Sequence, residues 1–487
     1  MCSAVRELGP VRAYRELRRD FAPLVLVLAA GDLVASLGFS LIFPFLTLYL
    51  TQHLGASAVQ AGLVLAGYSL CSIASGATGG WLADRIGRRA VMVPSVSITA
   101  VVVVLMGQAG DLVQIAALVV VLGLVDPAFV PAARAAIADV VEEERRPRAY
   151  SLLAVASAVG WIAGPSIGAG LATLGYPLLF TIAGLLIGCY GLIALRWLPE
   201  TLPRRAAGTR AVASSAEPAA TSRLATHRER QGGPDAEPVL PPPGAPLAAA
   251  AELVVADASI RSRELRSADE AGRTPARGAR AAVDPRLVFA AFLPIAVVVH
   301  AATFQWVAIL PIHASRSLGV PTAEWGLLFS INGILIVLLQ LRVTSVAERF
   351  AKPLVMAAAT LCYAAGSLVT VLVTRPADAA WGLGLTIVLV TFGEILLFPI
   401  EPAFVSDLSP IERRGRYQGL LLAADGLGSA VGPPLGGLCL DLAPGATLWL
   451  ITAGSLVLSA AALAGLSRLS GRMAPPAEAA LAGLPAG

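Results

Sequence analysis

The sequence predicts an all-α membrane protein in which twelve transmembrane helices form two pseudo-symmetric six-helix halves. Of its 487 residues, 56% are hydrophobic and only 14% are charged, which is far outside the range of soluble domains. Apolar runs that can cross about 30 Å of hydrocarbon recur along almost the whole chain. The second half of the sequence also repeats features of the first, as expected when two bundles share one architecture.

The N-terminal half is expected at residues 21–201, after a cytoplasmic tail at 1–20. The tail is basic but leads into an apolar run that is too long for the core of a signal peptide, so we expect no cleaved signal. The six predicted spans of this half lie at about 21–50, 58–82, 90–109, 112–135, 149–172 and 178–198.

A hydrophilic stretch at 202–284 separates the two halves. It is rich in Ala, Pro, Arg and Glu and has no sustained apolar period, which is typical of a flexible cytoplasmic linker. Only 248–268 suggests a helix that would lie on the membrane surface. A tether is the simpler interpretation, and a regulatory role is the alternative.

The C-terminal half is expected at 285–466, followed by a cytoplasmic tail at 467–487. Its predicted spans lie at about 286–312, 323–345, 353–373, 381–405, 417–440 and 446–466.

The distribution of basic residues predicts the orientation. Segments that would face the cytoplasm hold clusters of arginine, whereas the opposite loops hold only Arg316 and Arg375 among basic residues. This asymmetry places both termini in the cytoplasm and predicts a multi-pass protein of the plasma (cytoplasmic) membrane, which is the cell inner membrane. The formal net charge of +4 follows from the same bias, so we expect no nucleic-acid partner.

The internal repeat places an acidic residue inside a span of each half. Aligning Glu394 with Asp126 also superposes Pro399 on Pro131, together with the arginines that follow both segments. A charged side chain inside a bilayer costs about 2.5–3.5 kcal/mol, so each one needs a reason. An acid in both copies predicts a secondary transporter with a site between its halves.

A glycine- and arginine-rich segment, GGWLADRIGRRAVM, follows the second span. It resembles the signature loop of the major facilitator superfamily, which joins the second and third helices on the cytoplasmic side. The resemblance implies the major facilitator fold and a cytoplasmic gate made by Gly80, Leu82, Asp84, Arg85, Gly87, Arg88 and Arg89.

The chemistry of this gate follows from its residue types. Gly80 permits close helix approach, Asp84 can accept from the N-terminus of a facing helix or from an arginine, and the arginines can bind helix C-termini. Such contacts close the cytoplasmic side in one state and break in the other. The second half has a copy without the glycines at 347–352, so its latch is expected to be weaker.

The fifth span carries GWIAGPSIGAG, which resembles the antiporter motif of drug–proton exporters in the same superfamily. Its glycines share one helix face, and its proline can bend the helix; close helix packing is the alternative role. The residues are Gly160, Gly164, Pro165 and Gly168, and the eleventh span repeats them as Gly428, Gly432, Pro433 and Gly436. Together with WLPET at 197–201, these motifs resemble the 12-helix drug:proton antiporter (multidrug efflux) group.

Four buried carboxylates are the candidates for proton or substrate coupling: Glu394, Asp126, Asp32 and Glu401. A carboxyl group that is neutral when occluded and charged when paired can exchange a proton for a cationic substrate. The alternative for each is a structural hydrogen bond or salt bridge, which suits Asp425 best. His300 is a candidate proton relay or a neutral, hydrogen-bonded side chain.

One departure from the family pattern limits this scheme. Many relatives carry an arginine in the fourth span, four residues before a glycine, whereas here Val119 precedes Gly123. A coupling scheme that relies on this arginine cannot be transferred to this chain.

Polar and aromatic residues of several spans are candidate cavity-lining groups, and ordinary packing is the alternative for each. Aromatic rings with a few acids suit lipophilic cations through cation–π attraction. These candidates are Gln305, Trp306, Asn332, Gln340 and Tyr68.

The sequence lacks a P-loop, an H-E-x-x-H motif, a plausible Ser–His–Asp set and cysteines at metal-ligand spacing. We therefore expect no enzyme, no catalytic residues, no cofactor and no metal site. The predicted function is proton-coupled export of lipophilic, cationic compounds (drug:H⁺ antiport). Its partners would be a small-molecule substrate, protons and the lipid bilayer, and a monomer would suffice. The alternatives are a proton-coupled transporter of one metabolite (sugar, peptide or amino acid) and a non-transporting membrane sensor.

Overall fold

The computed structural model describes residues 23–142, 146–201, 283–410 and 413–470. The predicted tail at 1–20, nearly all of the linker at 202–284, and the C-terminal tail beyond residue 470 lie outside the described residues.

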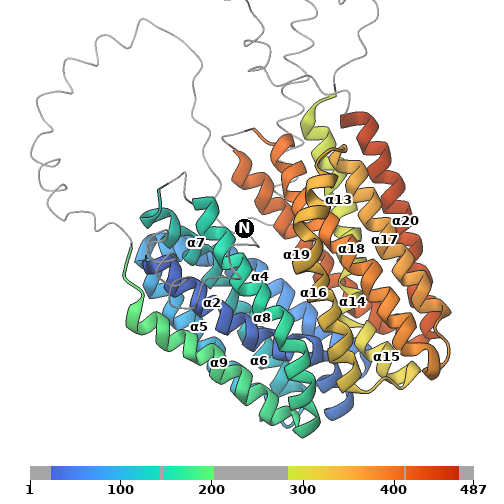
Figure 1. Cartoon of the computed structure of the whole chain (residues 1–487), viewed down its shortest axis with the longest axis horizontal. Coiled ribbons are helices and arrows are strands. Elements are labelled where there is room, and N and C mark those ends of the chain that lie inside the picture. Colours follow the sequence, from blue (N-terminus) through green and yellow to red (C-terminus); the bar gives the residue numbers. More distant parts are fainter. Residues whose placement is uncertain (1–22, 143–145, 202–282, 411–412, 471–487) are drawn as a thin grey trace, which may run out of the picture.

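The N-terminal half consists of six membrane-crossing segments, two of which are interrupted (Figure 1). The first is α2 (Pro23–Ile42), which continues through η1 (Phe43–Phe45), α3 (Leu46–Leu48) and η2 (Tyr49–His53). The fourth is α6 (Leu112–Val125), η3 (Asp126–Ala128) and α7 (Phe129–Val140). The others are α4 (Ala58–Ile86), α5 (Arg88–Met106), α8 (Arg146–Leu174) and α9 (Tyr176–Trp197).

The C-terminal half has the same organisation (Figure 1). Its first segment is α13 (Pro285–Thr303), α14 (Gln305–Ala308) and α15 (Leu310–Leu318). The remaining five are α16 (Thr322–Ala347), α17 (Lys352–Leu372), α18 (Pro376–Leu408), α19 (Arg414–Leu442) and α20 (Gly445–Ser470).

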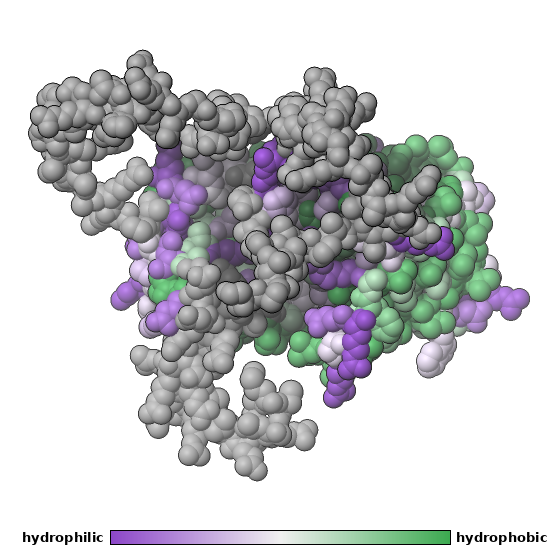
Figure 2. All heavy atoms as spheres, turned by 90° about the horizontal axis from the view of Figure 1, so that it is seen from above, coloured by the Kyte–Doolittle hydropathy of each residue, from purple (hydrophilic) through white to green (hydrophobic). Residues whose placement is uncertain are grey.

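Eleven of these segments are long and apolar enough to cross a membrane among the described residues. The exception is α19, which is 29 residues long and occupies the place of the eleventh predicted span. Its many glycines, two prolines and Asp425 lower its mean hydropathy without shortening it. Large apolar side chains such as Trp381 and Leu341, 87% and 84% exposed, cover the outside of the bundle, and Figure 2 shows this apolar surface over the C-terminal half. The structure is therefore the all-α membrane fold that the sequence predicts.

Local sequence explains where key helices begin and break. Ser57 caps α4 in a reciprocal capping box with Gln60. Gly87 adopts φ +114° between α4 and α5, a conformation that L side chains rarely adopt. The fourth segment changes to a 3-10 turn at Asp126, because the proline that follows cannot continue the α-helical hydrogen bonding. This break leaves Asp126 at a helix junction inside the membrane.

Among the described residues, the contacts between the two halves gather toward one end. We call the end with the α4–α5 turn the cytoplasmic end, following the predicted orientation, and the opposite end the outer end. Across the interface, α19 packs against α4 and α16 packs against α8. A Cβ on Gly62, Gly426 or Gly437 would collide with the opposite half, whereas one on Gly415 or Gly419, nearer the cytoplasmic end of α19, would meet nothing within 4 Å.

The ribbons of the two halves accordingly converge at the lower end of Figure 1 and diverge at the upper end. In the predicted orientation this arrangement is open to the cytoplasm and closed to the outside.

Candidate functional site

The N-terminal half holds a cavity lined by two of the predicted acids. Asp32 of α2 and Asp126 at the α6–η3 junction line the same space of about 170 Å³, together with Phe129 and Tyr190. The rings of Phe129 and Tyr190 meet edge to face with centroids 5.3 Å apart. Tyr68 of α4 lies close enough to Asp126 to interact with its charge. The structure thus brings Asp32 and Asp126 together, although they are far apart in the sequence.

The C-terminal half holds a second, narrower cavity around Glu394. The Asn332 amide donates to the Glu394 carboxylate at 2.5 Å and to the Thr391 hydroxyl at 3.0 Å. The cavity measures about 30 Å³ and is lined by Trp306, Trp325, Phe329 and apolar residues of α18. A single carboxylate among aromatic rings is an arrangement that attracts an organic cation.

The tryptophans of this second cavity carry unused hydrogen-bond donors. In the described part of the chain, the indole Nε1 atoms of Trp306 and Trp325 are buried and have no hydrogen-bond partner. Buried polar groups are usually satisfied, so such donors are suited to an acceptor on a ligand or to water.

Two of the predicted cavity-lining residues have other contacts. Gln305 is buried and donates from Nε2 to the Gly432 carbonyl at 2.6 Å, so it joins α14 to the glycine face of α19. Gln340 donates to the Ile395 carbonyl and to the Thr344 hydroxyl, both at 3.1 Å. Neither lines the two acid cavities described above.

A cluster of ionisable groups lies between α13, α18 and α19. His300 Nε2 is 3.2 Å from the Glu401 carboxylate, and its Nδ1 is 3.1 Å from the Asp425 carboxylate. The three residues are called the His300 triad below. The sequence offered His300 and Glu401 as candidates and assigned Asp425 a structural role, without predicting that the three would meet.

The gate motif makes its contacts within the N-terminal half. Arg88 is buried and pairs with Asp84 at 2.8 Å and with Asp139 at 3.1 Å. Arg89 donates to the Leu195 carbonyl near the C-terminus of α9 at 2.6 Å. The side chain of Asp84 is 71% exposed, and among the described residues it makes no contact with the C-terminal half. Of the two partners predicted for Asp84, a facing helix N-terminus or an arginine, this conformation shows the arginine.

Glu200 supports the same motif and was not singled out from the sequence. Its carboxylate accepts from the backbone N–H groups of Arg88 and Arg89 at 2.9 and 3.2 Å, at the start of α5. It also fills the space beside Gly87, where a Cβ would lie 2.7 Å from its Cδ. Glu200 belongs to the WLPET segment, so the resemblance of that segment to exporters was the feature of the sequence that could have drawn attention to it.

The glycine motifs are packing faces. Gly160, Gly164 and Gly168 of α8 lie against α2. In α19, Gly428 and Gly432 lie against α13, and Gly436 lies against Gln305 of α14. The carbonyl of Pro165 contacts Gly326 of α16 in the opposite half. The motif of α8 thus faces both its own half and the interface between the halves.

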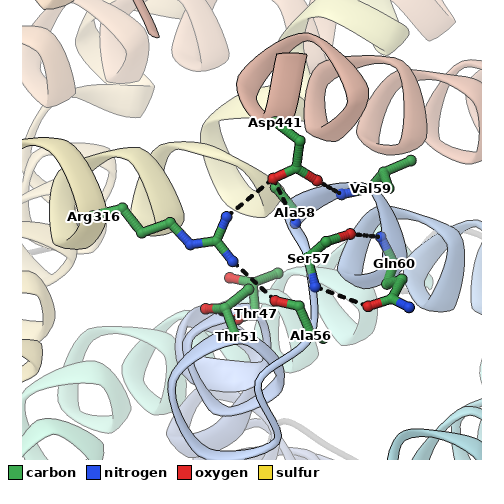
Figure 3. Close-up of polar contacts among 9 residues, drawn as sticks. All are labelled: Thr47, Thr51, Ala56, Ser57, Ala58, Val59, Gln60, Arg316 and Asp441. Atoms are coloured by element: carbon green, nitrogen blue, oxygen red, sulfur yellow. Dashed lines mark hydrogen bonds and ion pairs between the residues drawn. The ribbon is translucent and has the colours of Figure 1, made fainter. Parts of the chain in front are cut away.

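A polar cluster joins the halves at the outer end (Figure 3). Asp441 of α19 accepts from the backbone N–H groups of Ala58 and Val59, at 3.1 and 2.9 Å, in the first turn of α4. Arg316 pairs with Asp441 at 3.1 Å and donates to the Ala56 carbonyl at 2.9 Å. We call these contacts the outer latch.

The outer latch depends on a charged carboxylate. Asp441 lies beyond the predicted span that ends at 440. Burial would raise the pKa of Asp441, but hydrogen bonds from Val59, Ala58 and Ser57, together with the Arg316 charge, lower it. The sequence indicates this contact only weakly, because Arg316 is one of two basic residues in the predicted outer loops and nothing in the pattern links it to Asp441.

A larger cavity of about 580 Å³ lies elsewhere, between α16 and α17. Its lining is almost entirely apolar and includes Val346, Phe350 and Leu354, which are 52%, 61% and 47% exposed. It lies on the outside of the bundle, where lipid chains would fill it. No group of three or more His, Cys, Asp or Glu side chains in the described ranges has a metal-binding arrangement.

Comparison with known proteins places this architecture in a family. The model of the Major Facilitator Superfamily matches residues 28–313 and 292–484. The chain is 24% identical to an uncharacterized MFS-type transporter, YqjV of Bacillus subtilis (strain 168), over 87% of this chain and 88% of that protein. It is 37% identical to the multidrug resistance protein MdtG of Serratia proteamaculans (strain 568), over 34% of this chain and 41% of that protein.

Solved structures share the fold at low identity. A POT family transporter superposes with a TM-score of 0.68 at 13% identity, covering 91% of this chain and 96% of that one. The nucleoside transporter NupG superposes with a TM-score of 0.63 at 15% identity, covering 91% and 99%.

Proposed function

Because the chain belongs to the Major Facilitator Superfamily, we propose that this membrane transporter exports lipophilic, cationic compounds in exchange for protons. The substrate would bind between the two halves, which would rock to expose it to one side of the membrane and then to the other.

The observation that carries the proposal is the environment of Glu394. Its carboxylate has one polar partner, Asn332, and otherwise shares its cavity with Trp306, Trp325 and Phe329. An organic cation would neutralise the carboxylate and stack on the rings, a combination worth about 2 kcal/mol or more when the site is desolvated. A polar metabolite would find few hydrogen-bonding groups there, so this lining favours a lipophilic substrate over a sugar or an amino acid.

The acids Asp32 and Asp126 support coupling to protons. They share one cavity in the opposite half, and Asp126 is the repeat partner of Glu394. Burial in this cavity disfavours the charged form of a carboxylate, so these acids tend to bind a proton or a cation. Proton binding and substrate binding at the central acids would then exclude each other, as antiport requires.

Relatives support the direction of transport. Multidrug resistance proteins match a third of the chain, and the glycine motif of α8 resembles that of drug–proton exporters. The peptide and nucleoside transporters of similar fold are at most 16% identical, so they support the fold alone.

Transport by purified protein tests the proposal. The probe is ethidium, a lipophilic cation, in proteoliposomes with and without an imposed proton gradient, and protein-free liposomes give the passive leak. We expect gradient-dependent transport by the wild type and a loss of at least about tenfold in Glu394→Gln, since a hydrogen bond to a charged group contributes about 1.5–3 kcal/mol.

The matched control is Glu324→Gln, which removes an exposed carboxylate from the first turn of α16 and should transport like the wild type. Thermal unfolding of both variants shows whether they are folded. Equal gradient-driven transport by Glu394→Gln and the wild type would contradict the assignment of Glu394.

A further inference from the structure

The His300 triad is buried at one end and exposed at the other. The side chains of His300 and Glu401 are 9% and 6% exposed, whereas that of Asp425 is 48% exposed. Three helices contribute one residue each, so the cluster depends on the packing of α13, α18 and α19. A Cβ on Gly428 would lie 2.7 Å from the His300 Cβ. The glycine therefore allows α19 to approach closely enough to bring Asp425 to the imidazole.

The contacts of the two ring nitrogens indicate how many protons the triad holds: Nε2 lies within hydrogen-bond distance of Glu401, and Nδ1 forms an ion-pair contact with Asp425. A neutral imidazole has one N–H donor and one acceptor nitrogen, and a carboxylate only accepts. Here both ring nitrogens face carboxylate oxygens, at 3.2 and 3.1 Å. One proton on the ring would leave a lone pair facing a carboxylate, so the arrangement needs a second proton. The triad is therefore a place where a proton is stored within the membrane.

Among the described residues, the charges that act on His300 and Asp425 come from within the triad itself. On α17, Tyr363 interacts electrostatically with both Glu401 and Glu394. The only charged residue of α20 is Arg468, in its last turn. On α13, the charged residue besides His300 is Arg286, at the cytoplasmic start of the helix. The two carboxylates thus face the imidazole without a fixed cation beside them.

The exposed end of the triad lies where the two halves separate. Asp425 precedes Gly426, which packs against Ile73 of the N-terminal half, while Gly419, one to two turns nearer the cytoplasmic end, faces open space. In this conformation a proton can exchange between Asp425 and the cytoplasmic side. Closure of that side would bring α4 against this part of α19 and cover Asp425.

The triad is also close enough to Glu394 to respond to a bound cation. Glu401 follows Glu394 by seven residues on α18, which is about 10 Å at 1.5 Å per residue. Two positive charges at that separation disfavour each other by roughly tenfold in affinity at an effective dielectric of about 20. A substrate at Glu394 therefore weakens proton binding at the triad, and a proton at the triad weakens substrate binding.

We propose that His300, Glu401 and Asp425 form the proton-binding site of the transport cycle, separate from Glu394, which binds the substrate. This inference rests on the proposed function and specifies where its proton is held. When a substrate binds from the cytoplasm, the triad releases its proton through Asp425. When the triad binds a proton from the outside, substrate binding weakens and the substrate is released there.

Proton-driven transport and downhill exchange of ethidium are two assays that distinguish the role of the triad from that of Glu394. We expect Glu401→Gln and His300→Gln to lose proton-driven ethidium transport by at least tenfold while keeping downhill ethidium exchange within about twofold of the wild type, because substrate binding at Glu394 is intact. Glu394→Gln should lose both modes. Equal loss of both modes in folded triad variants, or retention of proton-driven transport, would overturn the proposal.

A matched control is His313→Gln in α15. Burial lowers the pKa of His313 to about 4, so this histidine is neutral at physiological pH, and the variant should keep both transport modes. If the wild type moved no ethidium in either mode, the proposed function would fail for this substrate class.

The protonation of His300 can be measured without any substrate. In protein labelled with ¹⁵N-histidine, we expect the resonances that His300→Gln removes to report protons on both ring nitrogens near neutral pH. In Glu401→Gln, one of these protons should be lost at lower pH than in the wild type. A single N–H on His300 near neutral pH would overturn the inference, whatever the transport assays show.

Discussion

The two ends of the interface between the halves use the same chemistry but are in opposite states. At the outer end, Asp441 of one half binds the first N–H groups of α4 in the other half, and Arg316 reinforces it. At the cytoplasmic end, Asp84 is exposed and pairs with Arg88 of its own half. A carboxylate therefore binds across the interface at the outer end, whereas the corresponding carboxylate at the cytoplasmic end pairs within its own half.

This difference indicates how an alternating-access transporter can keep two states, one closed at the outer end and one closed at the cytoplasmic end, similar in free energy. Contacts at a helix N-terminus contribute about 1 kcal/mol each, enough to favour closure at one end without locking it. If Asp84 engages a C-terminal-half helix when the cytoplasmic end closes, the outer latch must open in the same step. The two ends therefore compete, and substitutions at each should shift the equilibrium in opposite directions.

The largest effect is expected from locking the outer end. The hydroxyls of Ser166 and Ser330 meet across the interface at 2.7 Å, so cysteines at these positions would bring two thiols together. In a background without the five native cysteines, Ser166→Cys with Ser330→Cys should abolish ethidium transport under oxidising conditions and recover it on reduction.

A matched pair within one half controls for the disulfide itself. Thr370 and Thr386 also meet, at 3.1 Å, but both belong to the C-terminal half. Cysteines at these positions should leave transport intact, and normal transport by the oxidised Ser166–Ser330 pair would mean that the outer end does not open.

A smaller effect is expected from crowding the outer interface. A Cβ on Gly437 would meet the carbonyl of Ala58 in the opposite half, and overpacking costs about 1–3 kcal/mol. Gly437→Ala should therefore open the outer end about fivefold or more. The readout is alkylation of a cysteine introduced as Ser330→Cys, because Ser330 is only 6% exposed when this end is closed.

Gly454 offers the control for this variant, since a Cβ there would meet nothing within 4 Å. Gly454→Ala should leave the alkylation rate unchanged. Equal rates in both variants would show that the closed outer end tolerates the added carbon.

Removing the charge of the outer latch should have a moderate effect of the same sign. Asp441→Asn keeps an oxygen for one N–H group but loses the charge that binds Arg316, which amounts to about 1 kcal/mol. The alkylation rate should rise about fivefold. Because the pKa of Asp441 is lowered, the latch is intact at neutral pH and is lost as pH falls through that lowered value. Acid should therefore raise the alkylation rate of the reporter with Asp441 intact, when that rate is expressed relative to a free thiol at the same pH.

The smallest effect, with the opposite sign, is expected at the cytoplasmic end. Asp84→Asn removes an exposed ion pair worth a few tenths of a kcal/mol in this conformation. It should also weaken the state in which the cytoplasmic end is closed. Alkylation of the outer reporter should fall slightly and transport should slow. A faster alkylation rate in this variant would show that the two ends do not compete.

Much of the fold was predictable because the length and hydrophobicity of a sequence segment are enough to identify a membrane helix. All twelve predicted spans correspond to helical segments, including α19, whose glycines make it less apolar than the others. The fold class is confirmed, whereas the orientation and the predicted linker remain predictions.

The candidate site was predictable only in part, because sequence gives depth along a helix but not which helices are neighbours. Glu394 and Asp126 followed from the repeat. The meeting of His300 with Glu401 and Asp425 needs the packing of three helices, and the glycine at position 428 permits it. The outer latch was missed because a lone aspartate at a helix end carries no pattern.

The most direct test of proton-coupled export is whether substrate movement alone moves protons. Proteoliposomes containing ethidium and a lumenal pH dye, with the membrane voltage clamped by potassium and valinomycin, are diluted into ethidium-free buffer of the same pH. Ethidium leaving the vesicles should drive protons in, so we expect the lumen to acidify with wild-type protein and not with Glu394→Gln. Ethidium efflux above the protein-free leak without any change in lumenal pH would contradict it.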